Sequence, residues 1–423
     1  MEALILTAGK GTRLYPLTKT IPKPLIPIAG SPLILHSLDV LKNNVNKVII
    51  VIGHESEKIK RVINKKGYPF EIVWVIQKEQ LGTGHAVQLC KEFINSTHFF
   101  MMYGDIFTAP NVIKEIIRLG QSIGHSEGIF AAKSVENPEN YGCLEIKNDL
   151  LVKIVEKDPH PSSNQINAGM MILPTTIFES LNHTFESSRG ETELTDGINL
   201  LIQNGAKISL YYIKEYWIDI GYPWSLLEAN EIGLYASEFR KRHNIPKGVT
   251  IEGEVNLASN VTLRPGTFIQ GPVMIDENTV VGPNCFIRPA SYLGKNVRIG
   301  NAVEIKNSII LDNTTIDHLS YVGDSVIGNG CSFGAGTKVA NLKLEKNEIN
   351  MTIQGKVLST GRKKLGVFLG DNVKTGINVS LMPGITIGSN SRIGAHTLVN
   401  QNVPSNTLLY QDPKHGLTQK PLE

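Results

Sequence analysis

The sequence predicts two architectures in one chain: an open, mostly parallel α/β sheet of the Rossmann-like kind, followed by a left-handed parallel β-helix. Short apolar runs alternate with helical patterns in the first half of the chain. The second half instead carries an aliphatic residue at every sixth position. The length of 423 residues exceeds what one ordinary core needs, which agrees with two or three domains.

The α/β domain is predicted over residues 1–225. Four apolar runs have the length and composition of buried strands: 4–6, 47–52, 73–76 and 99–102. Helical patterns separate them at 33–41 and 112–119. Alternating strands and helices favour a parallel sheet covered on both faces, whose ligands bind at the carboxyl ends of the strands.

A helical linker is predicted over residues 226–245. Apolar residues at helical spacing follow Trp224, and the segment ends in the basic run Arg240, Lys241 and Arg242 before Pro246. Basic residues in a last turn and a following proline are signals of a helix C-terminus.

The β-helix is predicted over residues 246–405, with a C-terminal tail at 406–423. Eleven aliphatic residues from Ile251 to Leu311 are spaced by six, and the period returns from Leu369 to Val399 with Thr375 in one slot. A strict period of six is the pattern of a hexapeptide β-helix. Glycines and asparagines between the aliphatic residues suit its tight corners.

Two interruptions break this period. After Leu311 the next inward candidates are Ile316, Val322 and Ile327, so sixteen residues replace eighteen, and His318 lies inside this slip. A local departure from a strict repeat favours function over packing. The second interruption, 342–367, is rich in lysine and arginine, and is either a solvated loop or an anion-binding arm.

Composition excludes several classes of protein. The net charge of +3 argues against binding to nucleic acid or to a membrane surface. The chain contains no apolar run of about 20 residues, and its N-terminus resembles a first strand rather than a signal peptide. Its four cysteines lie far apart without CxxC spacing, which favours a reducing cytoplasm and offers no zinc site.

The first predicted strand runs into a phosphate-binding pattern. Gly9 and Gly11 let the backbone approach a phosphate, while Arg13 and Lys23 supply positive charge. Prolines on both sides of Lys23 stiffen the chain there. The pattern is neither a dinucleotide fingerprint, because Leu14 stands where a third glycine belongs, nor a Walker A loop.

A series of motifs in residues 1–230 resembles the sugar-1-phosphate nucleotidylyltransferases. The motifs are Leu6-x-x-Gly-x-Gly-Thr-Arg-Leu-x-Pro-Leu-Thr with Pro22-Lys-Pro24, Gln77 to Ala86, Tyr103-Gly-Asp105, Asn137-Pro with Tyr141-Gly142, Glu156-Lys157, Asn167-Ala-Gly169, and Trp217 to Trp224. The resemblance implies that a sugar-1-phosphate oxygen attacks the α-phosphorus of a nucleoside triphosphate and that pyrophosphate leaves. Catalysis of this kind is mostly positioning and charge neutralisation.

The same resemblance implies roles for individual residues. Asp105 and Asp219 would hold Mg²⁺, and Arg13 and Lys23 would be catalytic. The implied nucleotide-binding residues are Gly9, Gly11, Gln77, Gly82 and Thr83. The implied sugar-phosphate-binding residues are Tyr103, Gly142, Glu156 and Asn167.

Motifs in the second half resemble the acetyltransferase half of bifunctional N-acetylglucosamine-1-phosphate uridylyltransferase/glucosamine-1-phosphate acetyltransferases. The motifs are Ile287-Arg-Pro-Ala290, Val303-Glu-Ile-Lys306, His318 to Asp324 and Phe333 to Thr337. The resemblance implies that His318 is the general base on an amine, a suitable role because histidine titrates near neutral pH. It also implies that Arg288 and Lys306 bind the sugar phosphate, Tyr321 and Asn341 position the acceptor, and Ala335 lies by acetyl-CoA.

The chain departs from the bacterial pattern, with Leu342-Lys-Leu344 after Asn341 and Ser332 in the preceding turn, and it is most similar to the archaeal type. The expected function is acetylation of glucosamine-1-phosphate by acetyl-CoA, then uridylyl transfer from UTP to the product, in a cytoplasmic homotrimer with small-molecule partners only. The sequence leaves open whether the nucleotide is UTP or dTTP. It also leaves open whether the sugar phosphate is that of glucosamine, galactosamine or glucose. Two alternatives are a glucose-1-phosphate uridylyl- or thymidylyltransferase whose β-helix serves only oligomerisation, and a catalytically inactive assembly subunit.

Overall fold

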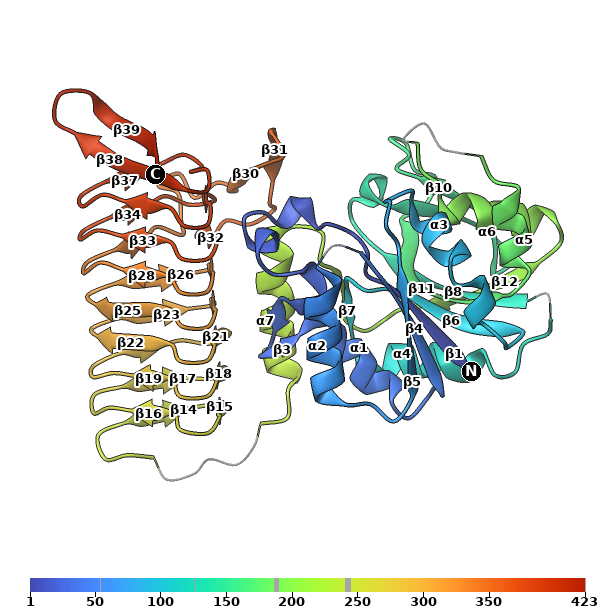
Figure 1. Cartoon of the computed structure of the whole chain (residues 1–423), viewed down its shortest axis with the longest axis horizontal. Helices are drawn as coiled ribbons and strands as arrows, with labels where there is room; N and C mark the ends of the chain where they lie inside the picture. Colours follow the sequence, from blue (N-terminus) through green and yellow to red (C-terminus); the bar gives the residue numbers. More distant parts are fainter. Residues whose placement is uncertain (54, 126, 186–189, 240–244, 423) are drawn as a thin grey trace. The chain divides into compact units, whose positions relative to one another are not determined.

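The computed structural model describes residues 1–53, 55–125, 127–185, 190–239 and 245–422 (Figure 1). The chain divides into two compact units. The first unit comprises residues 1–10, 22–25 and 32–219, and the second comprises residues 11–21, 26–31 and 220–423.

A nine-stranded sheet forms the centre of the first unit, in the order β5-β4-β1-β6-β11-β8-β12-β10-β9. Its first four strands are parallel: β5 Glu71–Ile76, β4 Lys47–Ile52, β1 Glu2–Leu6 and β6 His98–Tyr103. These are the four strands predicted from apolar runs. Their order, with β1 between the second and fourth strands of the chain, is the Rossmann-like arrangement that the sequence predicts.

The other half of the sheet is mixed. Its strands are β11 Gln165–Pro174, β8 Glu127–Ser134, β12 Lys207–Tyr212, β10 Leu150–Glu156 and β9 Gly142–Lys147. β11 is antiparallel to β6 and β8, and β9 and β10 form a hairpin through Asn148 and Asp149, both at positive φ. A two-residue turn with two positive φ values joins antiparallel strands. The expectation of a mostly parallel sheet therefore holds for the first four strands, whereas in the other half only β8 and β12 are paired in parallel.

Helices cover both faces of the sheet, as expected. α1 (Leu33–Leu41), α2 (Ser56–Lys66) and α4 (Pro110–Leu119) contribute to the apolar core on one face. α3 (Thr83–Gln88), α5 (Ile177–Asn182) and α6 (Leu194–Gln203) contribute to the core on the other. Successive β1 residues alternate between the two cores, with Ile5 in the first and Leu4 in the second. Two short strands, β7 (Ile106–Thr108) and β13 (Trp217–Asp219), pair beside this sheet.

The second unit contains a three-sided parallel β-helix (Figure 1). One side consists of β14 Thr250–Glu252, β17 Phe268–Gln270, β20 Phe286–Ile287, β23 Glu304–Lys306, β26 Tyr321–Gly323, β29 Lys338–Val339, β34 Ser380–Leu381 and β37 Leu398–Val399. The next consists of β15 Val255–Leu257, β18 Val273–Ile275, β21 Ser291–Leu293, β24 Ile309–Ile310, β27 Val326–Ile327, β32 Phe368–Leu369 and β35 Thr386–Ile387. The third consists of β16 Thr262–Leu263, β19 Val280–Val281, β22 Arg298–Asn301, β25 Thr315–His318, β28 Ser332–Phe333, β33 Lys374–Thr375, β36 Arg392–Ile393 and β38 Thr407–Asp412.

Strand register confirms the period of six. Ile251 pairs with Ile269, Ile269 with Ile287, and Ile287 with Ile305, so a coil of three hexapeptides returns each aliphatic side chain to the same column. These side chains form one continuous core. Thr375 occupies its predicted inward slot, where its hydroxyl lies 2.9 Å from that of Thr337. Stacked coils of this kind bury one core along the whole solenoid.

The predicted slip is real, but its register was wrong by one residue. Leu293 pairs with Ile310, and Ile310 pairs with Ile327, so Ile310 rather than Leu311 points inward. The coils from Leu293 to Ile310 and from Ile310 to Ile327 therefore each contain 17 residues, whereas the prediction placed sixteen residues in one coil, from Leu311 to Ile327. The corner before β24 and the corner before β27 are each one residue shorter than the hexapeptide period requires. The inward side chain of the strand that follows is therefore one position earlier in the sequence.

The second interruption leaves the β-helix as predicted. Within residues 342–367, β30 (Asn350–Ile353) and β31 (Lys356–Ser359) form an antiparallel hairpin in a sheet of their own. The β-helix resumes when Phe368 pairs with Val326. Anion binding by this arm stays a prediction.

The described residues of both the predicted linker and the predicted tail include regular secondary structure. α7 extends over Pro223–Ala236 and ends nine residues before the end of the predicted linker at residue 245, because Ser237 is extended; the basic run at 240–242 lies outside the described residues. In the tail, β38 pairs with β36 and then forms a hairpin with β39 (Gly416–Pro421). Leu409 joins the core, so the last coil continues past the predicted boundary at residue 405.

Candidate functional sites

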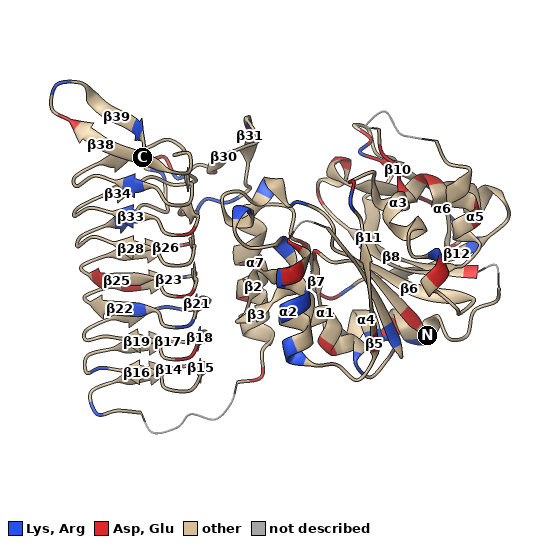
Figure 2. Ribbon diagram, viewed as in Figure 1, with Lys and Arg blue, Asp and Glu red and all other residues tan. Residues whose placement is uncertain are grey.

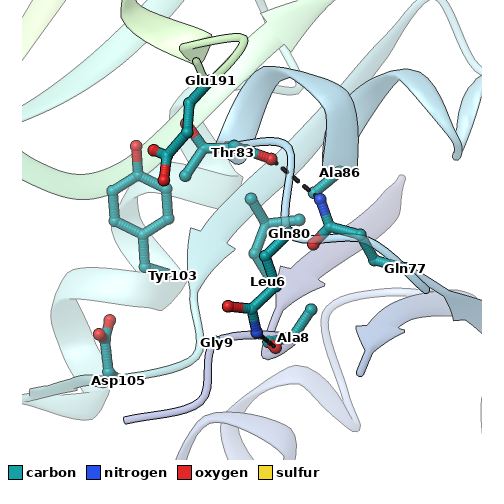
Figure 3. Close-up of a pocket in the computed structure, with 11 residues that line it drawn as sticks. Leu6, Ala8, Gly9, Gln77, Gln80, Thr83, Ala86, Tyr103, Asp105 and Glu191 are labelled. Atoms are coloured by element: carbon teal, nitrogen blue, oxygen red, sulfur yellow. Dashed lines mark hydrogen bonds between the residues drawn. The ribbon is translucent and has the colours of Figure 1, made fainter. Parts of the chain in front are cut away.

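A cavity of about 300 Å³ opens in the first unit at the carboxyl ends of its parallel strands (Figure 3). It lies between β1, from which the chain continues to β4, and β6, from which the chain continues in the opposite direction to β8; open α/β sheets bind ligands at such a position. The lining residues are Leu6, Ala8, Gly9, Gln77, Gln80, Gly82, Thr83, Ala86, Tyr103, Asp105 and Glu191. In Figure 3, Tyr103, Asp105 and Glu191 lie on one side and Gln77 and Gln80 on the other.

The loop after β1 offers bare backbone to this cavity. A Cβ added at Gly9 would meet no atom within 4 Å, so the glycine leaves open space that a ligand can enter. The loop itself is held in place because Gln80 donates a hydrogen bond from Nε2 to the carbonyl of Ala8, at 2.9 Å. This geometry suits the close phosphate approach predicted for the glycine-rich turn.

The predicted nucleotide-binding segment is held in place by contacts with the backbone of Thr192. Gly82 has φ of 100°, and a Cβ there would lie 2.4 Å from the carbonyl oxygen of Thr192. Gly84 donates its N–H to that same oxygen at 2.8 Å. The buried Gln77 donates from Nε2 to the Gly82 carbonyl at 3.0 Å, which orients its amide along the cavity wall. Thr83 caps the start of α6 by accepting the N–H of Leu194.

Asp105 and Asp219 come together from distant parts of the chain. β13 is antiparallel to β7, and this pairing sets Asp219 opposite Ile106, the neighbour of Asp105. Lys23 Nζ lies 2.6 Å from Asp105 Oδ2, with only 11% of the lysine side chain exposed. In the described part of the chain no group of three His, Cys, Asp or Glu residues converges. Two carboxylates plus substrate phosphates and water is a donor set that Mg²⁺ accepts.

The predicted sugar-binding residues also converge. Gly142 pairs with Glu156 in the β9–β10 hairpin, and a Cβ at Gly142 would lie 2.8 Å from the glutamate Oε1. Asn167 accepts the N–H of Gly169 at 2.8 Å and hydrogen bonds to Tyr103. Burial and the nearby Glu156 carboxylate raise the pKa of the Tyr103 phenol, so it remains protonated at neutral pH.

Two predicted residues belong to the other unit. Gly11, with φ of 63°, and Arg13 lie in the segment 11–21 that clusters with the second unit. The guanidinium of Arg13 lies 5.2 Å from the ring centroid of Tyr222, within the range of a cation–π contact. They are therefore not assigned to the first-unit cavity, and their roles stay predictions.

The second-unit site lies on consecutive coils of the β-helix, at the ends of β20, β23 and β26. Lys306 contacts Asp324 at 3.0 Å, and Asn341 donates from Nδ2 to both Asp324 and the hydroxyl of Tyr321. Arg288 pairs with Glu304 at 2.9 Å. Four predicted residues are thus close together, and each of the two cations has an acidic partner that the sequence did not identify.

His318 ends β25 with its side chain exposed. Its carbonyl accepts the hydroxyl of Ser320 at 2.8 Å and the N–H of Gly336 at 3.1 Å. The second bond stacks the turn that contains Ala335 directly on the turn after His318. The predicted base and the predicted acetyl-CoA-binding backbone therefore occupy adjacent coils.

Sequence reasoning missed Asp324, Glu304 and Glu191 as site residues. Asp324 had a usable signal, because it follows Lys306 by about one coil and so returns to the same corner. Glu191 follows Gln77 by more than a hundred residues with no repeat to connect them, and the cavity alone reveals it.

Acidic and basic residues are interspersed in both units (Figure 2), which agrees with the net charge of +3. Within the described ranges the chain forms no helix that is both long and apolar enough to cross a membrane.

Three family models match the chain. The nucleotidyl transferase family matches residues 2–234, the GMPPB C-terminal domain matches 269–381, and the bacterial transferase hexapeptide (six repeats) family matches 366–401. These matches follow the division into an α/β unit and a β-helix and confirm both parts of the predicted fold.

Relatives match over the full length. A bifunctional protein GlmU of Methanococcus maripaludis is 43% identical over 423 residues, which cover 99% of this chain and 100% of the relative. A bifunctional sugar-1-phosphate nucleotidylyltransferase/acetyltransferase of Sulfurisphaera tokodaii is 40% identical over 95% of this chain and 98% of its own. The solved structure of a UDP-glucose pyrophosphorylase with UDP-glucose matches at a TM-score of 0.50 and 25% identity, covering 56% of this chain and 99% of that one.

Proposed function

Because the chain belongs to the nucleotidyl transferase family and, over its full length, to the bifunctional GlmU family, we propose that it catalyses two successive reactions. It acetylates glucosamine-1-phosphate with acetyl-CoA, and it transfers a uridylyl group from UTP to N-acetylglucosamine-1-phosphate, giving UDP-GlcNAc and pyrophosphate. The observation that carries the proposal is that one chain holds two separate clusters of polar residues. One surrounds Asp105 and the other surrounds Asp324.

In the first cluster, the sugar phosphate oxygen attacks the α-phosphorus of UTP while the bond to pyrophosphate breaks. Mg²⁺ held by Asp105 and Asp219 would neutralise phosphate charge. Lys23, buried against Asp105, presents its ammonium to the same phosphates, and Arg13 is proposed to add a second cation. Gln77 and the Gly82 backbone orient the base, while Tyr103, Glu156 and Asn167 orient the sugar. Positioning and charge compensation supply most of the catalysis in such reactions.

In the second cluster, the amine of the hexosamine attacks the thioester carbonyl of acetyl-CoA, and the thiol of CoA leaves. His318 accepts the amine proton as the C–N bond forms. Arg288 and Lys306 bind the sugar phosphate, Tyr321 and Asn341 orient the ring, and the backbone at Ala335 lies by the thioester.

The proposal includes a homotrimer in the cytoplasm. Met382, directly after β34, and Leu398, in β37, expose apolar side chains that a neighbouring subunit can cover. All four cysteines are free and buried, which suits a reducing compartment. A solution mass near three chains supports the trimer, whereas a monodisperse monomer contradicts it.

Two assays on the wild-type chain test the proposal. CoA release is measured with acetyl-CoA and glucosamine-1-phosphate, and pyrophosphate release with UTP and N-acetylglucosamine-1-phosphate. Galactosamine-1-phosphate, glucose-1-phosphate and dTTP serve as competing substrates. Both releases are expected. Pyrophosphate release without CoA release from any hexosamine phosphate would instead support a glucose-1-phosphate uridylyl- or thymidylyltransferase whose β-helix serves oligomerisation.

A further inference from the structure

We propose that Asp324 is a positioning residue of the acetyl-transfer site, whose buried carboxylate sets the direction of the hydrogen bonds that Lys306, Asn341 and Tyr321 offer to the sugar phosphate. This inference rests on the proposed acetyltransferase function.

Asp324 is the centre of its cluster. Its side chain is only 4% exposed. Its two oxygens accept Lys306 Nζ at 3.0 and 3.2 Å, Asn307 Nδ2 at 2.8 Å, and Asn341 Nδ2. A carboxylate has about four lone-pair directions, so these four contacts from three side chains saturate it.

The contacts fix which polar atoms remain for a ligand. An ammonium has three N–H donors, and among the described residues Asp324 is the partner of Lys306, which leaves one donor for a phosphate oxygen. The Asn341 Nδ2 group donates to Asp324 and to the Tyr321 hydroxyl at 3.1 Å, so its amide oxygen remains as an acceptor. Tyr321, having accepted that bond, keeps its O–H as a donor.

Burial and the same carboxylate both favour the protonated form of Tyr321. Burial, and then the charge of Asp324, raise the pKa of the Tyr321 phenol, whereas the hydrogen bond from Asn341 opposes the rise. The phenol therefore stays a donor at neutral pH. The site presents donors from Lys306 and Tyr321 and an acceptor from Asn341, a pattern suited to a phosphate beside an amino sugar.

The other ion pair on this side of the β-helix behaves differently. Arg288 and Glu304 are 37% and 36% exposed, so Glu304 can turn into solvent and release the guanidinium to a phosphate. Asp324 has no such freedom. Its N–H is bonded to the Lys306 carbonyl at 2.9 Å and its own carbonyl accepts Gly366 N–H at 2.8 Å. Buried ion pairs gain little net stability, so folding alone is a weak reason to keep this one.

The shortened coils build this corner. Asn307 and Asp324, 17 residues apart, both adopt positive φ and stack at the corners where a residue is missing. At the neighbouring Gly323, a Cβ would lie 2.5 Å from the Tyr321 hydroxyl and 2.8 Å from Asn341 Nδ2. The register slip therefore brings the carboxylate and its three partners together, which gives the interruption a function beyond the placement of His318.

Asp324→Asn in the full-length chain tests the proposal. The new amide N–H faces the donors of Lys306 and Asn341, so we expect the KM for glucosamine-1-phosphate in CoA release to rise at least tenfold. The KM for acetyl-CoA and the rate of pyrophosphate release should stay within twofold of wild type. Glu277→Gln is the matched control, because it removes the carboxylate of the Lys295 pair elsewhere on the β-helix, and it should leave all three values unchanged.

Asp324→Glu is the second variant, since it keeps the charge but displaces it by one methylene. Its KM for glucosamine-1-phosphate should fall between those of wild type and Asp324→Asn, with the KM for acetyl-CoA unchanged. A wild-type sugar-phosphate KM in either folded variant, or an equal rise in both KM values, overturns the proposal. If wild-type protein releases pyrophosphate but no CoA, the proposed function fails before this inference is reached.

Discussion

Replacing His318 by alanine removes the proposed general base with little effect on the fold. The imidazole is exposed, and the hydrogen bonds of this residue to Ser320 and Gly336 use its backbone carbonyl, which alanine retains. Surface substitutions of this kind change the free energy of unfolding by less than about 0.5 kcal/mol. A positioned base contributes about 10²–10⁴ in rate, or about 3 to 5 kcal/mol of activation free energy.

The assay compares the two reactions of the same preparation. For His318→Ala we expect CoA release to fall about 100- to 10,000-fold while pyrophosphate release stays within twofold and the thermal midpoint is unchanged. His183→Ala, which removes another exposed histidine at the end of α5, is the control and should affect neither reaction. Wild-type CoA release by His318→Ala would refute its assignment as the base. Parallel loss of both reactions would show that the substitution disturbs the fold.

Three further predictions concern the metal site, a buried ion pair and the β-helix core. Asp105→Ala should lower pyrophosphate release at least about 100-fold and leave CoA release within twofold, because several kcal/mol of charge stabilisation is lost only in the first site; equal loss of both would contradict this. Burial opposes ionisation of Glu2, but its ion pair and hydrogen bonds lower its pKa from 4.5 to about 2, so Glu2→Gln should reduce the free energy of unfolding by about 3 kcal/mol at pH 7. This loss should shrink as pH falls from 4.5 toward 2, where the wild-type carboxylate is protonated, and urea titrations at pH 7 and pH 3 that show no such change would contradict it. Thr375→Val should lower the free energy of unfolding, measured by thermal unfolding, by about 0.5–1.5 kcal/mol, because the buried hydroxyl of Thr337 loses its bond to Thr375 and keeps only the one that it donates to the Gly334 carbonyl, whereas Thr262→Val, at an exposed position, should cost little.

The β-helix was predictable because a strict spacing encodes it locally. Each aliphatic residue returns to the same column after three hexapeptides, so the register of Ile251, Ile269 and Ile287 follows from counting alone. Counting failed at Leu311, where two adjacent aliphatic residues could each be the inward one. Only the pairing of Leu293 with Ile310 decides between them.

The first-unit site was predictable from its motifs, but its interactions were not. Asp105 and Asp219 are over a hundred residues apart, and the β7–β13 pairing that joins them has no local signal. The Lys23–Asp105 ion pair likewise depends on tertiary packing. The acidic partners of Arg288 and Lys306 were also missed, although Asp324 follows Lys306 by about one coil, because matching charges across coils requires the true coil length.

A bifunctional chain performs acetyl transfer and then uridylyl transfer. The most direct measurement incubates the protein with ¹³C-acetyl-CoA, glucosamine-1-phosphate, UTP and Mg²⁺ and analyses the nucleotide sugars by mass spectrometry. We predict UDP-N-acetylhexosamine that carries the labelled acetyl group, and its absence when the His318→Ala or the Asp105→Ala variant replaces wild type. Formation of UDP-sugars without the labelled acetyl group would contradict this coupling of the two reactions.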